Sequence, residues 1–456
     1  MNALADEFRA LLGEQGVLTG DDVSSRSCDP FRNVPPLGGI ILRPANTEQV
    51  SEILKFCQAR QLHVVTHGGR TGVAGGAYAN SKEVVLSLER MNKISNICPL
   101  TQLAEVEAGV AVEALQSAAA DLDLFYPIDL GSKGSATIGG TIATNAGGNR
   151  VLRWGMTRQN VLGIEAVLAD GTIISSMNRL IKNNTGYDLK HFIIGTEGTI
   201  AIVTKAVLRL VPAPTSQFVA FVSVASHKHL IDLLSSARRL LTLSAFEVMW
   251  PDYYDLVSQS ETGRRPVEPG QAAYVLIEAM GYQEEIDQQL FEVFLEESYE
   301  AGLIVDAVTA MSKKQVADLW RVREAAEIIV REMSPFVSFD ISVDVREVDD
   351  FIHEAESALR SAFPNLKTAT FGHLGDNNIH IAAHIGSETL AYEHEIESIV
   401  FNVLKKFEGA ITAEHGIGQL KREFLADHKS DGEMDMMRRF RRAMDTQTTL
   451  NQDVLF

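Results

Sequence analysis

The sequence contains few cysteines, and their spacing fits no cysteine-based site. Cys28, Cys57 and Cys98 lie far apart, are odd in number and form no C-x-x-C pair. These features argue against a disulfide scaffold, a thiolate zinc site and an iron–sulfur cluster. A reducing compartment is therefore expected, and we predict a cytoplasmic protein.

Long hydrophobic runs are missing as well. The most apolar stretch, residues 192–211, contains Glu197, Lys205 and Arg209, whereas a membrane helix needs ~20 consecutive apolar residues. The start of the chain is acidic where a signal peptide would be basic and then apolar. We therefore expect neither a membrane span nor a targeting segment.

An excess of positive charge is also lacking. The chain has a formal net charge of -19, with 41 Lys and Arg residues against 60 Asp and Glu. Because nucleic-acid binding depends on clustered basic residues that displace counterions from phosphates, no nucleic-acid partner is expected. The G-x-G-x-x-G and G-x-x-x-x-G-K-[ST] patterns are absent from the sequence, which disfavours a Rossmann dinucleotide site and a P-loop.

What the chain does contain is enough apolar sequence for two or more folded units. Its 456 residues are 45% hydrophobic and 22% charged, as in ordinary globular enzymes. Periodicity predicts strands at 39–42, 62–66, 161–168, 172–175, 199–210, 218–224, 273–279 and 335–343. It predicts helices at 47–60, 283–301, 313–333 and 348–363. The mixture of strand–helix–strand and hairpin patterns indicates an α+β fold.

Two prolines suggest the main division of the chain. Pro212 and Pro214 interrupt the strand pattern before a section of long helices and short strands begins. We predict an N-terminal domain at 1–214, a second domain at 215–408 and a mostly helical segment at 409–456 that closes over the site.

Two glycine-rich segments are the first candidate functional feature. Residues 67–76 contain five glycines directly after a predicted strand, and residues 131–148 contain six. Such loops expose backbone N–H groups and let a pyrophosphate approach closely, although the first segment alone is also compatible with a tight flexible turn. The second segment keeps Ile138 and Ile142 among its glycines, which is unusual for a solvated linker. We interpret the pair as loops lying along an extended cofactor.

A second candidate feature combines histidines with a carboxylate. His373 and His380 flank a Gly-Asp-Asn-Asn turn that can bring both imidazoles to one point. Separate core or surface histidines are the alternative interpretation. Glu414 and His415 add a carboxylate and a third imidazole in a short glycine-flanked turn. Two imidazoles and one carboxylate suit Zn²⁺ or a similar divalent metal with positions open for substrate.

The order of these motifs resembles the FAD-binding fold of the vanillyl-alcohol oxidase type, and within it the D-2-hydroxyglutarate and D-lactate dehydrogenase branch. The resemblance spans roughly residues 38–456. It is carried by Gly68-Gly69-Arg70-Thr71-Gly72, Asp129-Leu130-Gly131, Gly139-Gly140, Ala143-Thr144-Asn145-Ala146-Gly147-Gly148, Asp188-Leu189 and Gly195-Thr196-Glu197-Gly198.

The resemblance implies a two-lobed FAD-binding domain, an α+β substrate (cap) domain and a helical C-terminal segment. The first glycine loop would hold the phosphates and the second would line the flavin and the ribityl chain, with 197–202 near the adenine. The implied cofactor-binding residues are Pro44, Gly68, Gly69, Arg70, Thr71, Gly72, Gly75, Gly76, Asp129, Leu130, Gly131, Ser135, Gly139, Gly140, Thr144, Asn145, Gly148, Glu197, Gly198, Ile202 and Asn451. His67 does not occupy the usual attachment context, so the FAD is expected to be non-covalent and His67 to be a hydrogen-bonded loop residue.

The same resemblance implies roles for the second candidate feature. The implied metal ligands are His373, His380 and Glu414, with His415 as the catalytic base and Arg323 as the residue that binds the substrate carboxylate. A nearby cation disfavours protonation of an imidazole and so keeps a base ready. A purely structural histidine is the alternative for His415. For Arg323, the alternative is an exposed helix arginine paired with Glu324 or Glu327.

These residues together imply an FAD- and metal-dependent dehydrogenase that oxidises a small D-2-hydroxy acid to the 2-oxo acid by hydride transfer to flavin N5. The electron acceptor would be a protein such as an electron transfer flavoprotein, or a quinone, and a homodimer is compatible with the resemblance. Two alternatives stay open: a flavin oxidase that uses O₂ directly, and a non-enzymatic, zinc-stabilised nucleotide-binding protein.

Three positions depart from the hydroxyglutarate pattern. Ser338 stands where a lysine is expected, Ala382 where an asparagine is expected and Glu327 where a threonine is expected. A cation for a distal carboxylate is therefore missing. A lactate-like, aromatic or polyhydroxy 2-hydroxy acid is as compatible with the sequence as a dicarboxylate.

Overall fold

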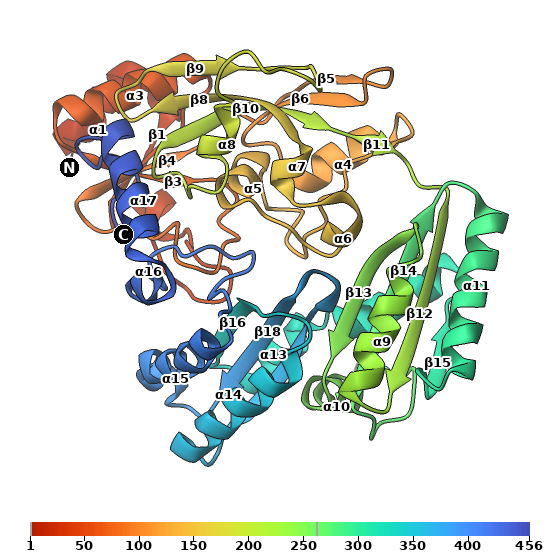
Figure 1. The fold of residues 1–456 in the computed structure, drawn as a ribbon. Helices are drawn as coiled ribbons and strands as arrows, with labels where there is room; N and C mark the ends of the chain where they lie inside the picture. Colours follow the sequence, from red (N-terminus) through yellow and green to blue (C-terminus); the bar gives the residue numbers. More distant parts are fainter. Residues whose placement is uncertain (1, 261–262) are drawn as a thin grey trace. The chain divides into compact units, whose positions relative to one another are not determined.

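The computed structural model describes residues 2–260 and 263–456, so residues 1 and 261–262 lie outside the described part (Figure 1). The chain divides into two compact units. The first unit consists of Met1–Gly148, Gly155–Ala213 and Glu414–Phe456, and the second of Asn149–Trp154 and Pro214–Ala413. Unlike the division predicted from the sequence, this one assigns a short segment after Gly148 to the second unit.

The first unit contains a four-stranded sheet with the order β1-β2-β4-β3. Its strands are β1 (Val17–Thr19), β2 (Ile40–Leu42), β3 (His63–His67) and β4 (Glu83–Ser87), of which β2, β4 and β3 run parallel. Helix α3 (Thr47–Ala59) connects β2 to β3, as the sequence predicts. Asn46 caps this helix by accepting the backbone N–H of Gln49.

A five-stranded antiparallel sheet, ordered β5-β6-β10-β8-β9, completes the first unit's main framework. Its strands are β5 (Ile94–Cys98), β6 (Leu103–Glu107), β8 (Val161–Leu168), β9 (Ile173–Ser176) and β10 (Ala201–Arg209), and a separate pair joins β7 (Leu124–Phe125) to β11 (Val211–Pro212). The predicted β8–β9 hairpin is confirmed. Asp170 accepts the N–H of Thr172 at 2.8 Å, and Gly171 has a φ of 82°, which suits glycine in a tight turn.

Short helices surround these two sheets. They are α1 (Asn2–Leu12), η1 (Glu14–Gly16), α2 (Asp21–Ser24), α4 (Val112–Ala120), α5 (Ile138–Thr144), α7 (Thr157–Asn160), α8 (Lys190–Ile193), α16 (Arg422–Leu425), η4 (Ala426–His428) and α17 (Asp431–Met444). One apolar core runs from α1 and α3 through both sheets to α5. The predicted α+β fold of this region is confirmed.

The predicted C-terminal segment is helical, but its helices occupy less than half of residues 409–456. Residues 414–421 and 446–456 are irregular, and α16, η4 and α17 are the helical parts. Gly416 and Gly418 have φ values of 83° and 56°, which a right-handed helix does not allow. The backbone N–H of Gly418 instead donates to the carboxylate of Glu197 at 2.7 Å. This N–H therefore makes a tertiary hydrogen bond in place of the backbone hydrogen bond that it would make in a helix.

The second unit is built on a seven-stranded antiparallel sheet with the order β15-β12-β14-β13-β17-β18-β16. The strands are β12 (Ser216–Val224), β13 (Leu243–Met249), β14 (Ala273–Gly281), β15 (Asp306–Thr309), β16 (Val337–Ser342), β17 (Lys367–His373) and β18 (Asn378–His384). The helices are α6 (Val151–Trp154), α9 (His227–Ala237), α10 (Pro251–Gln259), α11 (Glu284–Glu300), α12 (Lys313–Arg323), α13 (Ala326–Met333), α14 (Val348–Ala362), η2 (Leu374–Asp376), η3 (Thr389–Tyr392) and α15 (Glu393–Lys406).

Helices cover both faces of this sheet. An aromatic and aliphatic core packs α10, α12 and α13 against one face. Helices α9 and α11 pack against β12, and α15 packs against β16 (Figure 1). No helix in the described part of the chain is both long enough and apolar enough to span a bilayer.

The single helix predicted at 313–333 is two helices. Helix α12 ends at Arg323, and α13 begins at Ala326. The buried hydroxyl of Tyr253 lies 2.8 Å from the carbonyl oxygen of Arg323 and 3.3 Å from the backbone nitrogen of Ala325. Because Tyr253 satisfies these backbone groups, the chain can bend there. The bend makes Arg323 the last residue of α12.

Candidate functional site

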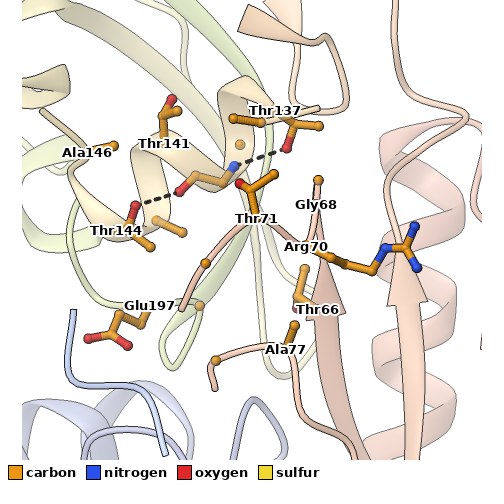
Figure 2. A pocket seen from close by; sticks show the side chains of 18 of the residues that line it. Thr66, Gly68, Arg70, Thr71, Ala77, Thr137, Thr141, Thr144, Ala146 and Glu197 are labelled. Carbon is orange, nitrogen blue, oxygen red and sulfur yellow. Dashed lines mark hydrogen bonds between the residues drawn. The ribbon is translucent and has the colours of Figure 1, made fainter. Parts of the chain in front are cut away.

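A cavity in the first unit is lined by both glycine-rich segments (Figure 2). The predicted cofactor-binding residues that line it are Gly68, Gly69, Arg70, Thr71, Gly72, Gly76, Leu130, Gly131, Gly139, Gly140, Thr144, Glu197, Gly198, Ile202 and Asn451. The structure therefore brings together segments that lie far apart in the sequence, as the resemblance implies.

The glycines allow the two loops to pack closely against each other. A Cβ at Gly69 would lie 1.9 Å from the carbonyl oxygen of Ser135, and one at Gly68 would lie 2.5 Å from the hydroxyl of Thr137. Any larger residue at Gly69 would separate the first loop from the second. These glycines therefore line the cavity and also allow the close packing of the two loops that enclose it.

Helix α5 gives the second loop its shape. Thr137 caps the helix, with its hydroxyl oxygen 3.4 Å from the backbone nitrogen of Gly140, and the hydroxyl of Thr144 donates to the Gly140 carbonyl at 3.1 Å (Figure 2). The helix ends at Asn145, which adopts a left-handed conformation with a φ of 52°. Hydroxyl and backbone groups therefore line this side of the cavity.

Glu197 and Asn451 close another side of the cavity. The Glu197 carboxylate accepts the N–H groups of Ile417 and Gly418 at 2.8 and 2.7 Å. Burial raises the pKa of Glu197, although these two hydrogen bonds oppose the shift. The side chain of Asn451 accepts the N–H of Thr66 at 3.0 Å and donates to the Glu197 carbonyl at 2.7 Å.

Some predicted cofactor residues do not line the cavity, namely Pro44, Gly75, Asp129, Ser135, Asn145 and Gly148. Several of them support those that do. The Ser135 carbonyl lies beneath Gly69, and the Asp129 carbonyl would lie 2.0 Å from a Cβ at Gly148. Thr66, Thr137 and Thr141 line the cavity but were not predicted; the last two fall inside the second glycine-rich segment.

His67 is a buried residue at the end of β3 and is not in the following loop. Its Nε2 lies 2.8 Å from the carbonyl oxygen of Ala77, so the predicted hydrogen bond is present. Burial lowers the pKa of His67 to about 4. His67 is also not among the residues that line the cavity.

Glu414 and His415 both line the cavity of the first unit. The Glu414 carboxylate accepts the backbone N–H of Gly148 at 3.1 Å, and His415 Nε2 lies 3.9 Å from Glu414 Oε1. The predicted base and one predicted metal ligand therefore lie beside the second glycine-rich segment.

His373 and His380 lie in the second unit on a β-hairpin. His373 ends β17, η2 forms the turn, and β18 carries His380. Their ring centroids are 5.3 Å apart, and both side chains are buried. The prediction that the turn brings both imidazoles together is confirmed, and the alternative of separate histidines is wrong.

Each histidine faces a buried carboxylate. The strand register pairs Val248 with Gly372, which puts Glu247 of β13 opposite His373. His373 Nδ1 lies 2.9 Å from Glu247 Oε1. On the other side, β16 pairs Asp340 with His380, and His380 Nδ1 lies 3.8 Å from Asp340 Oδ1.

Arg323 joins the same face of the sheet. Its Nε donates to Glu247 Oε2 at 2.8 Å, and its guanidinium carbon lies 4.8 Å from the centroid of the Phe371 ring. The residue is 5% exposed, so the alternative of an exposed helix arginine paired with Glu324 or Glu327 is wrong. Its Nη2 is buried and has no hydrogen-bond partner among the described residues.

Two functional candidates escaped the sequence analysis. Glu247 is the one charged residue in the apolar strand Leu243–Met249, which was the available signal. Burial alone would raise the pKa of Glu247, but His373 and Arg323 hold it below its usual range. Asp340 also accepts the hydroxyl of Thr412 at 2.9 Å and is the one charged residue in the strand Val337–Ser342.

The positions that depart from the hydroxyglutarate pattern can be located in the second unit. Ser338 and Ala382 are cross-strand partners two residues from Asp340 and His380, on the same face of the sheet. Ser338 is exposed and Ala382 is buried, while Glu327 is exposed in the first turn of α13. These three positions contribute no cation.

Two family models match most of the chain. Residues 39–176 match the model described as an FAD binding domain. Residues 213–454 match the model described as the C-terminal domain of FAD linked oxidases.

Curated relatives match over nearly the whole chain. A protein of Oryza sativa subsp. japonica named "Probable D-2-hydroxyglutarate dehydrogenase, mitochondrial" is 37% identical, covering 97% of this chain and 80% of the relative. A D-2-hydroxyglutarate dehydrogenase of Xanthomonas citri pv. viticola is 35% identical, covering 91% of this chain and 89% of the relative. One of Stutzerimonas stutzeri is 33% identical, covering 100% and 99%.

Solved structures share the fold at low sequence identity. A p-cresol methylhydroxylase with bound substrate has a TM-score of 0.78 at 17% identity, covering 99% of this chain and 95% of that one. A 4-ethylphenol oxidase of Gulosibacter chungangensis has a TM-score of 0.75 at 14% identity, covering 99% and 96%. These likenesses bear out the predicted fold of the vanillyl-alcohol oxidase type.

Proposed function

The chain belongs to the family of FAD-linked oxidases, and from that membership we propose that it oxidises a D-2-hydroxy acid to the 2-oxo acid. The names of the relatives, which are D-2-hydroxyglutarate dehydrogenases, support the substrate class. The observation that carries the proposal is the buried Arg323–Glu247–His373 cluster, because it combines a carboxylate-binding group with a metal-binding one.

The first unit fits a bound FAD. A Cβ at Gly69 would meet the backbone, so the close approach of the two loops depends on glycine. Their hydroxyl and backbone groups suit phosphates and the rim of a planar ring. We propose non-covalent binding, because His67 is buried, bonded to Ala77 and absent from the cavity lining.

The chemistry of the side chains also fits a divalent metal. We propose His373, His380 and Glu414 as its ligands. A carboxylate can only accept hydrogen bonds, so the contact with Glu247 means that Nδ1 of His373 carries the proton and that Nε2 is the nitrogen that would bind the metal. Imidazole and carboxylate ligands suit Zn²⁺, and other divalent metals also bind this combination of ligands.

When bound, FAD supplies the acceptor of the C2 hydride at N5, and the metal supplies a positive charge that lowers the pKa of the substrate hydroxyl. In this proposal Arg323 holds the C1 carboxylate through the nitrogen that has no protein partner. His415 accepts the hydroxyl proton as the general base. Glu414 and His415 are adjacent in the chain, so one turn carries both the ligand and the base.

The division of labour between the units follows the same proposal. The first unit, to which Glu414 and His415 belong, would bind FAD, and the second would bind the substrate. The electrons would then pass to a protein such as an electron transfer flavoprotein, or to a quinone.

The experiment that tests this function is turnover of purified protein with a panel of D- and L-2-hydroxy acids and a dye acceptor. We expect a 2-oxo acid from D-substrates and a flavin absorbance band near ~450 nm. Parallel oxygen-consumption assays test the oxidase alternative, which predicts equal rates without the dye. No 2-oxo acid from any D-2-hydroxy acid would rule out the proposal.

A further inference from the structure

We propose that Glu247 is a positioning residue that fixes both His373 and Arg323, so that one buried carboxylate sets the spacing between the metal and the substrate carboxylate. This inference rests on the proposed function. It assigns a role in the reaction to Glu247, a residue that acts through His373 and Arg323 and itself needs no contact with the substrate, the metal or the flavin.

The carboxylate of Glu247 contacts two functional groups at once. His373 Nδ1 lies 2.9 Å from Oε1 and 2.8 Å from Oε2, and Oε2 also accepts a hydrogen bond from Arg323 Nε at 2.8 Å. The side chain is 1% exposed, so water does not compete for these bonds. Charge-assisted hydrogen bonds in a buried site are short, directional and strong.

For His373 the contact sets both the tautomer and the ring orientation. With the proton on Nδ1, the lone pair on Nε2 points away from Glu247. The His373 ring crosses the His380 ring at 84°, with centroids 5.3 Å apart. Partners of this kind orient metal-binding imidazoles and raise their basicity.

For Arg323 the contact uses one edge of the guanidinium group. Nε donates to Glu247, while Phe371 packs against the guanidinium carbon at 4.8 Å from the ring centroid. Two constraints on a planar group fix its plane and its direction. Nη2, which has no protein acceptor among the described residues, is then presented in a fixed orientation to an incoming carboxylate.

The chemistry favours a carboxylate at this position. Glu247 accepts from two donors, one of them a guanidinium, and a carboxylate does so with a negative charge and with acceptors on both of its oxygens, whereas an amide is neutral and has one acceptor oxygen. A Glu247→Gln substitution keeps the shape but turns an NH₂ group toward one of the donors. The strand register places Glu247 opposite His373. A shorter side chain at position 247 would therefore reach Arg323 less well than glutamate does.

A second buried glutamate in the same sheet provides a matched control. Glu278 on β14 is 0% exposed and accepts from Arg150 Nε and Trp320 Nε1, both at 3.1 Å. It too pairs with an arginine, but it contacts neither His373 nor Arg323. A Glu278→Gln substitution therefore removes a buried, arginine-paired carboxylate from the same sheet without removing a contact of His373 or Arg323.

The test measures Zn²⁺ affinity by competition with a chelator, using the full-length flavin-loaded protein and its E247Q, E278Q and H373A variants. We expect E247Q to bind Zn²⁺ 10- to 100-fold more weakly, as is typical when a residue that orients a metal ligand is lost. Its KM for a D-2-hydroxy acid should also rise while its flavin absorbance is retained. E278Q should bind Zn²⁺ like the wild type.

The outcomes distinguish a failure of the positioning role of Glu247 from a failure of the proposed metal site. If H373A loses Zn²⁺ binding but E247Q keeps wild-type affinity, the positioning role is wrong and the metal site stands. If H373A binds Zn²⁺ like the wild type, the proposed metal site is wrong and this inference fails with it. Should E247Q not fold, Glu247→Asp serves instead, and wild-type affinity in that variant contradicts the proposal.

Discussion

The side-chain amide of Asn451 donates a hydrogen bond of 2.7 Å to the backbone carbonyl of Glu197, 254 positions earlier in the chain. The same Asn451 side chain accepts the N–H of Thr66 at 3.0 Å. All three residues line the cavity of the first unit. The C-terminal end of the chain thus holds two walls of the proposed FAD site together.

This contact predicts that Asn451→Ala weakens FAD binding. Loss of the side chain removes the hydrogen-bond partner of the half-buried Thr66 N–H and of the half-buried Glu197 carbonyl, at a cost of up to about 1–3 kcal/mol each. We expect a weaker FAD affinity in titrations of the apoprotein. The control is Gln452→Ala, because Gln452 bonds to Glu83 and does not line the cavity. Equal FAD affinities in the two variants would contradict the assignment.

A second prediction concerns the close approach of the glycine loops. Gly69→Ala should destabilise the protein by about 1–3 kcal/mol or more, because the added methyl group meets the Ser135 carbonyl. Gly72→Ala in the same loop meets nothing within 4 Å and should leave the apoprotein's stability nearly unchanged. Denaturant unfolding of both apoproteins measures the difference. Similar losses in both variants would show that the loops do not pack as described.

Much of the first unit could be predicted because its signals are local. The hairpin at Asp170-Gly171 and helix α3 depend on turn chemistry and a nearby cap, and both were predicted. The irregular tail could not be predicted, because the N–H groups of Ile417 and Gly418 bond to Glu197, over 200 residues away in sequence. Contacts between residues so far apart produce no periodic pattern in the sequence.

The candidate site shows the same limit. His373 and His380 were predicted because a recognisable turn separates them. Glu247 was not, since its role depends on the pairing of β13 with β17, two strands more than a hundred residues apart. The break between α12 and α13 escaped for a similar reason: it depends on the distant Tyr253 hydroxyl. The cytoplasmic location and the homodimer remain predictions.

A third prediction uses the low pKa of His67. Burial lowers that pKa to about 4 from the ordinary histidine value of about 6.5, so the unfolded chain binds a proton here at a higher pH than the folded protein does. The stabilising contribution is therefore complete above pH ~6.5 and is lost as the pH falls toward ~4, at about 1.4 kcal/mol per unit.

Denaturant unfolding of wild-type protein and His67→Gln at pH 7.5 and pH 5 tests this prediction. We expect the wild type to lose more of its free energy of unfolding than the variant over this interval. An equal loss in both proteins would mean that His67 does not titrate as its burial requires.

A fourth prediction concerns the proposed base. His415→Asn should lower kcat by about 10²- to 10⁴-fold, the usual contribution of a general base, while FAD stays bound. The control is His394→Asn, which replaces an exposed histidine on α15. Dye-linked turnover as a function of pH is the measurement. A variant that keeps both kcat and the wild-type pH profile would exclude His415 as the base.

A fifth prediction concerns the metal. Dialysis against a chelator should abolish turnover while leaving the flavin absorbance intact, and Zn²⁺ should restore activity. His380→Ala should be inactive before and after Zn²⁺ is added. Full activity of chelator-treated protein with no detectable metal would remove the metal from the account.

The central claim is that a D-2-hydroxy acid transfers a hydride to FAD bound by this chain. The most direct measurement is anaerobic bleaching of the flavin band near ~450 nm by a panel of D- and L-2-hydroxy acids, without any electron acceptor. We predict rapid bleaching by at least one D-2-hydroxy acid and much slower bleaching by its L-enantiomer. A flavin that stays oxidised with every D-2-hydroxy acid would contradict the account.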